Sequence, residues 1–181
     1  MAMMELGDCE LRCELDSHSD TMCAGNNCLL IEHIGEQVNV QPFSGTYKPI
    51  ANIPVGTAAT AYDCPDGTVM ILVFHQALCF GDKLKGTLLC PNQMRSNGVV
   101  IENCPSQFDP RSGHCIRIPV AGVAIPLEMD GVISYFRTRV PTWEEYHGCE
   151  CYLLTLDMTW EPYSTWFAEQ EELAHESRST S

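Results

Sequence analysis

The sequence Pro65-Asp66-Gly67-Thr68-Val69-Met70-Ile71-Leu72-Val73-Phe74 is the strongest structural signal in this chain. Residues 69–74 form an unbroken apolar run with the length of one buried strand. The Asp66-Gly67 step before them supplies the positive φ that a tight hairpin turn requires. Before the turn, residues 57–62 are mostly alanine and threonine, which suit a strand packed against another backbone. The segment therefore predicts a β-hairpin.

Further strand-like segments lie on both sides of this hairpin. Most of the 13 glycines and 11 prolines fall between the apolar runs. This turn-rich pattern is typical of an all-β sandwich or barrel. Additional strands are predicted at residues 11–15, 28–33, 38–40, 99–102, 115–118, 125–127 and 132–137.

Helical signals are sparse. Residues 89–98 predict one short helix, with Pro91 in its first turn and Gly98 as its C-terminal stop. Residues 163–176 predict a second helix with an acidic face, and the Ser-rich residues 177–181 are expected to be disordered.

Composition limits the class of protein. The length of 181 residues suits one domain with a single core, and 45% hydrophobic residues are typical of a globular protein. The net charge of −14 would repel nucleic acid and anionic membranes. No apolar run approaches the ~20 residues that span a bilayer, and the acidic start of the chain is unlike a signal peptide. We therefore expect a cytoplasmic protein that binds neither nucleic acid nor membrane.

The 11 cysteines are an odd number at irregular spacings, so they cannot all pair in disulfides. Free thiols are the simplest interpretation, many of them small buried hydrophobic groups. His147-Gly148-Cys149-Glu150-Cys151 resembles a set of zinc ligands, but no second ligand pair accompanies it. A loop entering a strand is therefore the preferred interpretation of this segment.

Glu14-Leu15-Asp16-Ser17-His18-Ser19-Asp20-Thr21 is the segment most indicative of function, because an apolar strand runs into Asp-Ser. It resembles the active-site segment of retropepsin-like aspartic proteases, in particular those of copia-type retrotransposons. Residues 86–99 resemble the apolar strand, short helix and glycine that close this protease domain. The Asp66-Gly67 hairpin lies between the two, where the family has its flap.

The resemblance covers most of residues 10–165, because residues 125–131 and 136–142 look like the continuation found in copia-like polyproteins. It implies a mainly β, retropepsin-like closed barrel or sandwich with a flap hairpin and one short helix. The implied division is a leader at 1–10, a protease core at 11–103 and a β-rich extension at 104–160. An acidic helix and tail follow at 161–181.

The resemblance implies an aspartic endopeptidase that cleaves its own polyprotein without a cofactor or metal. Such chemistry requires two carboxylates about 3 Å apart that share one proton. The chain has no second Asp-Ser/Thr-Gly segment, so Asp16 of two chains would form the dyad in a homodimer. Ser17 is expected to orient the loops. The substrate would lie between the dyad and the flap, which predicts contacts with His18, Ser19, Cys64, Asp66 and Gly67.

His18 departs from the family pattern, which has glycine at this position. Two alternatives remain open. Either the loop accommodates the imidazole, or the segment is a non-catalytic remnant that serves as a structural or interaction module.

A metal-dependent hydrolase is a further alternative. Asp16, His18 and Asp20 alternate along the chain, so an extended strand would place all three on one side, where they would bind a divalent metal. The other histidines show no spacing that would complete such a site.

Overall fold

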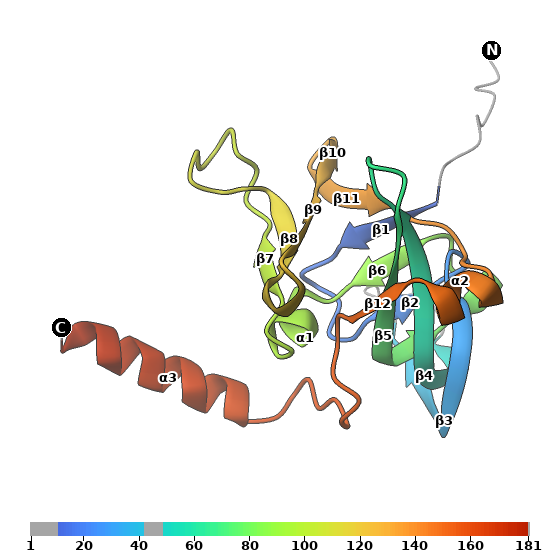
Figure 1. The fold of residues 1–181 in the computed structure, drawn as a ribbon. Helices are drawn as coiled ribbons and strands as arrows, with labels where there is room; N and C mark the ends of the chain where they lie inside the picture. The colour runs from blue at the N-terminus through green and yellow to red at the C-terminus, as the bar shows by residue number, and fades with distance from the viewer. Residues whose placement is uncertain (1–10, 42–48, 181) are drawn as a thin grey trace, which may run out of the picture.

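A computed structural model describes residues 11–41 and 49–180 (Figure 1). The predicted leader, residues 1–10, lies outside the described residues. The chain is mainly β, as the turn-rich pattern predicts. No helix in the described ranges is long and apolar enough to cross a membrane.

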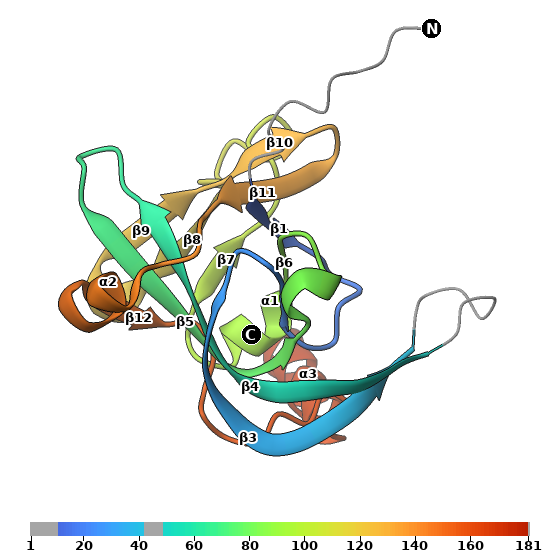
Figure 2. The same cartoon turned by 90° about the vertical axis from the view of Figure 1, so that its right-hand side faces the viewer.

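One large sheet organises the molecule. Its strands follow the order β10-β11-β1-β6-β2-β5-β4-β3, and β12 also pairs with β5. The order of the described strands ends at β10 on one edge and at β3 on the other, and these two strands do not pair with each other. The described strands therefore form an open, curved sheet instead of the closed barrel that the resemblance implies (Figure 2). The strands are β1 (Arg12–Leu15), β2 (Cys23–Ala24), β3 (Leu29–Val40), β4 (Ile50–Asp63), β5 (Val69–Cys79), β6 (Thr87–Leu89), β10 (Glu128–Asp130), β11 (Ile133–Arg137) and β12 (Glu150–Leu153).

The predicted hairpin is confirmed and is longer than predicted. β4 and β5 pair antiparallel from Asp63↔Val69 to Val55↔Leu78. Gly67 has φ +89° in the turn, and Asp66 Oδ1 accepts the Thr68 backbone N–H at 2.9 Å. The positive φ explains why Asp-Gly is a good signal for this turn.

β3 and β4 form a second long antiparallel hairpin. The sequence indicated two separate strands at 28–33 and 38–40, because β3 is largely exposed and lacks a clear apolar period. Its register shifts at several points, which bends the hairpin. Residues 42–48, which connect the two strands, are outside the described residues.

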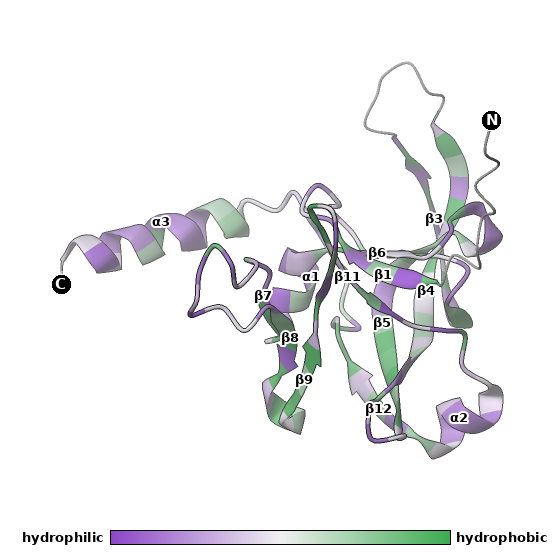
Figure 3. Ribbon diagram, turned by 90° about the horizontal axis from the view of Figure 1, so that it is seen from above, coloured by the Kyte–Doolittle hydropathy of each residue, from purple (hydrophilic) through white to green (hydrophobic). Residues whose placement is uncertain are grey.

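A smaller sheet covers one side of the core. β7 (Val100–Glu102), β8 (Cys115–Ile118) and β9 (Val123–Pro126) pair antiparallel in that order. Ile116 and Ile125 from this sheet belong to the same buried cluster as Leu72 and Phe74 of β5. In Figure 3, β5 and β9 are accordingly coloured as predominantly hydrophobic. Burial of these side chains stabilises the fold by about 1.5–3 kcal/mol each before the entropy of ordering is subtracted.

The C-terminal segments contribute to the same large sheet as the predicted protease core. β11 pairs antiparallel with β1, and β12 pairs parallel with β5. Residues beyond 104 therefore pair with one edge of the strand that leads to Asp16 and with β5 of the central hairpin.

Three α-helices are present in the described ranges. α1 (Pro91–Arg95) confirms the predicted short helix. α2 (Trp143–Gly148) was not predicted. α3 (Trp166–Ser179) begins later than predicted and continues through most of the Ser-rich segment that was expected to be disordered; it projects from the sheets and buries none of its residues (Figure 1).

Candidate functional site

Asp16 follows directly on β1 and lies beside the end of β6. The two strands are parallel, with Leu15 opposite Leu89, and the Asp16 backbone N–H donates to the Leu89 carbonyl at 3.0 Å. The two segments that carry the family resemblance therefore meet at Asp16.

A tight turn holds the Asp16 carboxylate. The Ser19 N–H donates to the Asp16 carbonyl at 3.1 Å, and the His18 N–H donates to Asp16 Oδ1 at 2.9 Å. Asp16 is half-buried, whereas Ser17 and His18 are exposed. One carboxylate oxygen is thus held by a backbone N–H, and the residue remains partly accessible.

The His18 backbone does not have the conformation that requires glycine. Among the described residues, positive φ outside glycine occurs only at Asn52, Gln76 and His114. A side chain at position 18 therefore carries no left-handed strain. The turn accommodates the imidazole on the exposed side of the loop.

Gln93 of α1 fixes the chain where it returns from the turn. Its Oε1 accepts the Met22 N–H at 2.8 Å, and its Nε2 donates to the Gln76 carbonyl at 3.1 Å. Gln93 is buried, so both backbone groups would otherwise lack a partner away from water. The short helix is thereby coupled to the loop that follows Asp16 and to β5.

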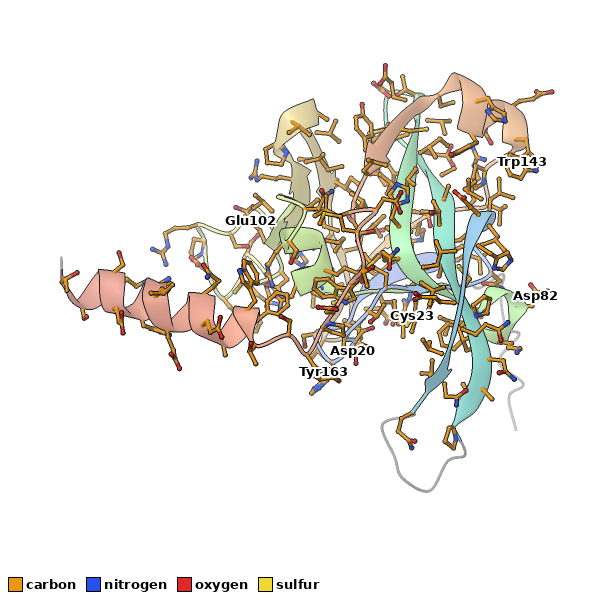
Figure 4. The ribbon with its side chains drawn as sticks, turned by 90° about the horizontal axis from the view of Figure 1, so that it is seen from below. Asp20, Cys23, Asp82, Glu102, Trp143 and Tyr163 are labelled. Atoms are coloured by element: carbon orange, nitrogen blue, oxygen red, sulfur yellow. The ribbon has the colours of Figure 1, made fainter. Side chains whose placement is uncertain are left out.

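A cavity of about 690 Å³ opens beside this loop. Five parts of the chain line it: the loop after Asp16, β2, the β3–β4 hairpin, the end of β5 and a segment before α3. Its lining residues include His18, Ser19, Asp20, Cys23, Glu36, Val38, Val55, Leu78, Trp160 and Tyr163. Figure 4 shows Asp20, Cys23 and Tyr163 on this side of the molecule.

The predicted contacts of Cys64, Asp66 and Gly67 are not brought to this cavity. Cys64 and Asp66 line a different one, with Tyr152 and Val123. β2 pairs with Leu78 and Cys79 at the end of β5, whereas the Asp66-Gly67 turn precedes its start at Val69. At about 3.3 Å per residue, the strand separates the two ends by up to roughly 30 Å. The hairpin beside the Asp16 loop is β3–β4, not the predicted one.

The described residues contain no group of three or more acidic, His or Cys side chains that could hold a metal ion. Asp16, His18 and Asp20 therefore do not form the metal site considered above, and His147, Cys149 and Cys151 do not form a zinc site. Asp20 has other partners: its Oδ1 accepts from Thr21 Oγ1 at 3.0 Å and its Oδ2 from the Tyr163 hydroxyl at 2.7 Å.

The cysteines of the described ranges are free thiols, as predicted. Burial raises the pKa of the Cys23 thiol to about 11, so this thiol stays protonated at neutral pH beside the cavity. Burial likewise raises the pKa of Cys79 to about 11. Neither has the thiolate character of a nucleophile.

No protein-family model, curated protein or solved structure matches this chain.

Two parts of the cavity were missed by sequence reasoning. β3 of the β3–β4 hairpin gave only two short strand signals, because its exposed residues follow no period. Tyr163 was assigned to the predicted helix at 163–176 and Trp160 was not singled out as a site residue, since contacts over more than 100 positions leave no local pattern.

Proposed function

We propose that this protein is a retropepsin-like aspartic endopeptidase of the copia type, active as a homodimer that cleaves a polyprotein. The observation that carries the proposal is the presentation of Asp16. Its carboxylate is held by the His18 N–H at the end of β1, against the apolar strand β6 that leads into α1.

The catalytic dyad would consist of Asp16 from each of two chains. Two carboxylates about 3 Å apart cannot both ionise, so the pair holds one proton. The ionised member takes a proton from a water molecule, whose oxygen attacks the peptide carbonyl carbon. The protonated member gives its proton to the carbonyl oxygen. A single chain supplies half of this site, and the accessible side of Asp16 is where the second carboxylate would approach.

Ser17 is proposed to orient the two loops across the two-fold axis. It is exposed next to the half-buried Asp16, which is compatible with a contact to a second chain. The exposed imidazole of His18 is compatible with the same arrangement, because its backbone needs no glycine.

The substrate is proposed to bind as an extended peptide in the cavity between residues 18–21 and the β3–β4 hairpin; Asp16 is not part of the lining and lies two residues before it in the chain. Apolar residues of the hairpin and of β5, including Val38, Val55 and Leu78, line this cavity together with polar groups of the loop. A mixture of this kind is typical of binding sites that hold a ligand by burial and orient it by hydrogen bonds.

The direct test is cleavage of a degenerate peptide library by the full chain and by its Asp16→Asn variant. We expect a reduction of roughly 10²–10⁴-fold in Asp16→Asn. Asp82→Asn is the matched control, since Asp82 is exposed and lies away from Asp20 and Cys23 (Figure 4). A statine-type transition-state mimic is expected to compete with the peptides. Equal cleavage by Asp16→Asn and the parent chain would exclude the proposal.

A further inference from the structure

Residues 159–163, here called the strap, reach the Asp16 loop from the opposite end of the sequence. The chain before the strap is anchored on β5. The Leu154 N–H donates to the Val73 carbonyl at 2.9 Å, and Thr155 Oγ1 donates to the His75 carbonyl at 2.6 Å. The strap therefore starts from a fixed point on the central strand.

Two side chains tie the strap to the loop. Trp160 Nε1 donates to the Asp20 carbonyl at 2.7 Å, across 140 positions of sequence. The Tyr163 hydroxyl donates to Asp20 Oδ2 at the same distance. Phe167 at the start of α3 packs edge-on against the Trp160 ring, with centroids 5.6 Å apart. The indole is thus held on two sides and cannot turn freely.

The strap and the β3–β4 hairpin both contribute to the cavity. Trp160 lines the same cavity as Val38 and Val55 of the hairpin and Leu78 of β5. Trp160 is half-buried and also packs against the main core, which limits how far its ring can move. A rigid aromatic wall opposite aliphatic side chains sets the width of the space between them.

We propose that the strap is one wall of the peptide-binding cleft and that Trp160 determines the size of the apolar side chain that the cleft accepts. This inference rests on the proposed protease function. The substrate class it names is a peptide with an apolar side chain inserted between Trp160 and the β3–β4 hairpin. The strap also places the Asp20 carbonyl and carboxylate, so that the loop keeps one shape when a peptide enters.

The test compares cleavage preferences of two Trp160 variants on a degenerate peptide library whose products are sequenced. Trp160→Ala enlarges the space, and we expect the kcat/KM ratio of peptides with bulky aromatic residues to those with valine to rise by about tenfold or more. Trp160→Phe removes the N–H donor but keeps an aromatic ring, so its preference for the peptide side chain should stay closer to that of the parent chain than the preference of Trp160→Ala does. Trp143→Ala is the matched control, because Trp143 lies on α2 on the opposite side of the molecule (Figure 4).

An unchanged preference in an actively cleaving Trp160→Ala variant would overturn the inference and leave the protease proposal intact. No cleavage by the parent chain would overturn the protease proposal and the inference with it.

A binding measurement covers the case in which Trp160→Ala does not fold. In an Asp16→Asn chain that also carries Trp143→Phe and Trp166→Phe, Trp160 is the remaining tryptophan of the three. Titration with a peptide that the parent chain cleaves should shift and quench its emission. A companion chain that retains only Trp143 should show no change. Emission of Trp160 that stays constant while the peptide binds would overturn the inference.

Discussion

Asp16 and Leu89 are joined by a backbone hydrogen bond of 3.0 Å at the end of two parallel strands. This contact brings together the Asp-Ser segment and the segment that leads into α1, which are far apart in the sequence. A tight turn cannot connect two parallel neighbouring strands such as β1 and β6. The chain between them forms the long strands β3, β4 and β5. This connecting segment includes the β3–β4 hairpin, which lies beside the loop after Asp16.

Gln93 should be the main stabilising residue of the loop that follows Asp16. Gln93→Ala removes the partners of the Met22 N–H and the Gln76 carbonyl, both in the buried region, and Gln76 already has a strained φ of +55°. We expect the free energy of unfolding in urea to fall by about 1–3 kcal/mol. Asn92→Ala, at the exposed neighbouring position, should have a much smaller effect. Equal stabilities of the two variants would contradict this role of Gln93.

Gly25 should tolerate no side chain. A Cβ at this position would collide with the carbonyl oxygen of Gly86 and lie 2.6 Å from that of Leu84, both of them backbone atoms that cannot rotate away. Gly25→Ala is expected to destabilise the protein by about 3 kcal/mol or more, or to prevent folding. Gly148→Ala is the control, because a Cβ there meets nothing within 4 Å. Thermal unfolding of both variants measures the difference, and a Gly25→Ala midpoint equal to that of Gly148→Ala would disprove the close approach.

The sequence predicted those elements whose signal is local. The apolar run at residues 69–74 and its Asp-Gly turn gave the β4–β5 hairpin, and Pro91 with Gly98 gave α1. α2 was missed although Thr142 and Glu145 form a capping box, a signal that the sequence contains.

The arrangement of the site is less predictable, because long-range pairing decides it. Asp16 was identified from its segment, but which hairpin lies beside it depends on the parallel pairing of β2 with the end of β5. No local pattern encodes that register. The contacts of Trp160 and Tyr163 with Asp20 are equally remote in sequence.

Glu145 should make stability depend on pH in the acid range. Hydrogen bonds from Arg139, together with the Thr142 N–H, lower the pKa of Glu145 from 4.5 to about 2. A folded-state pKa below the unfolded value gives stabilisation that is fully present above about pH 4.5 and is lost as the pH falls towards about 2.

Glu145→Gln is therefore expected to lower the free energy of unfolding by up to about 1 kcal/mol at pH 7 and to have little effect near pH 2. Urea titrations at several pH values measure this. Glu144→Gln, one position earlier on the exposed side of α2, is the control. A difference between Glu145→Gln and the parent that stays constant from pH 7 to pH 2 would refute the assignment.

The shared dyad should make activity depend on protein concentration. Since one chain supplies one Asp16, dilution below the dimer dissociation constant should reduce the specific activity, and sedimentation at the same concentrations should show the loss of dimer. Specific activity that stays constant while the protein dissociates would contradict the shared dyad.

Mixing parent chains with Asp16→Asn chains tests the shared dyad most directly. At a fixed total concentration that favours dimers, random pairing of equal amounts leaves about one quarter of the dimers with two intact Asp16 residues. With a shared dyad, cleavage should fall to about one quarter of the parent value, following the square of the parent fraction. Cleavage at about one half, in proportion to the parent fraction, would show that each chain works alone and would contradict the shared catalytic dyad.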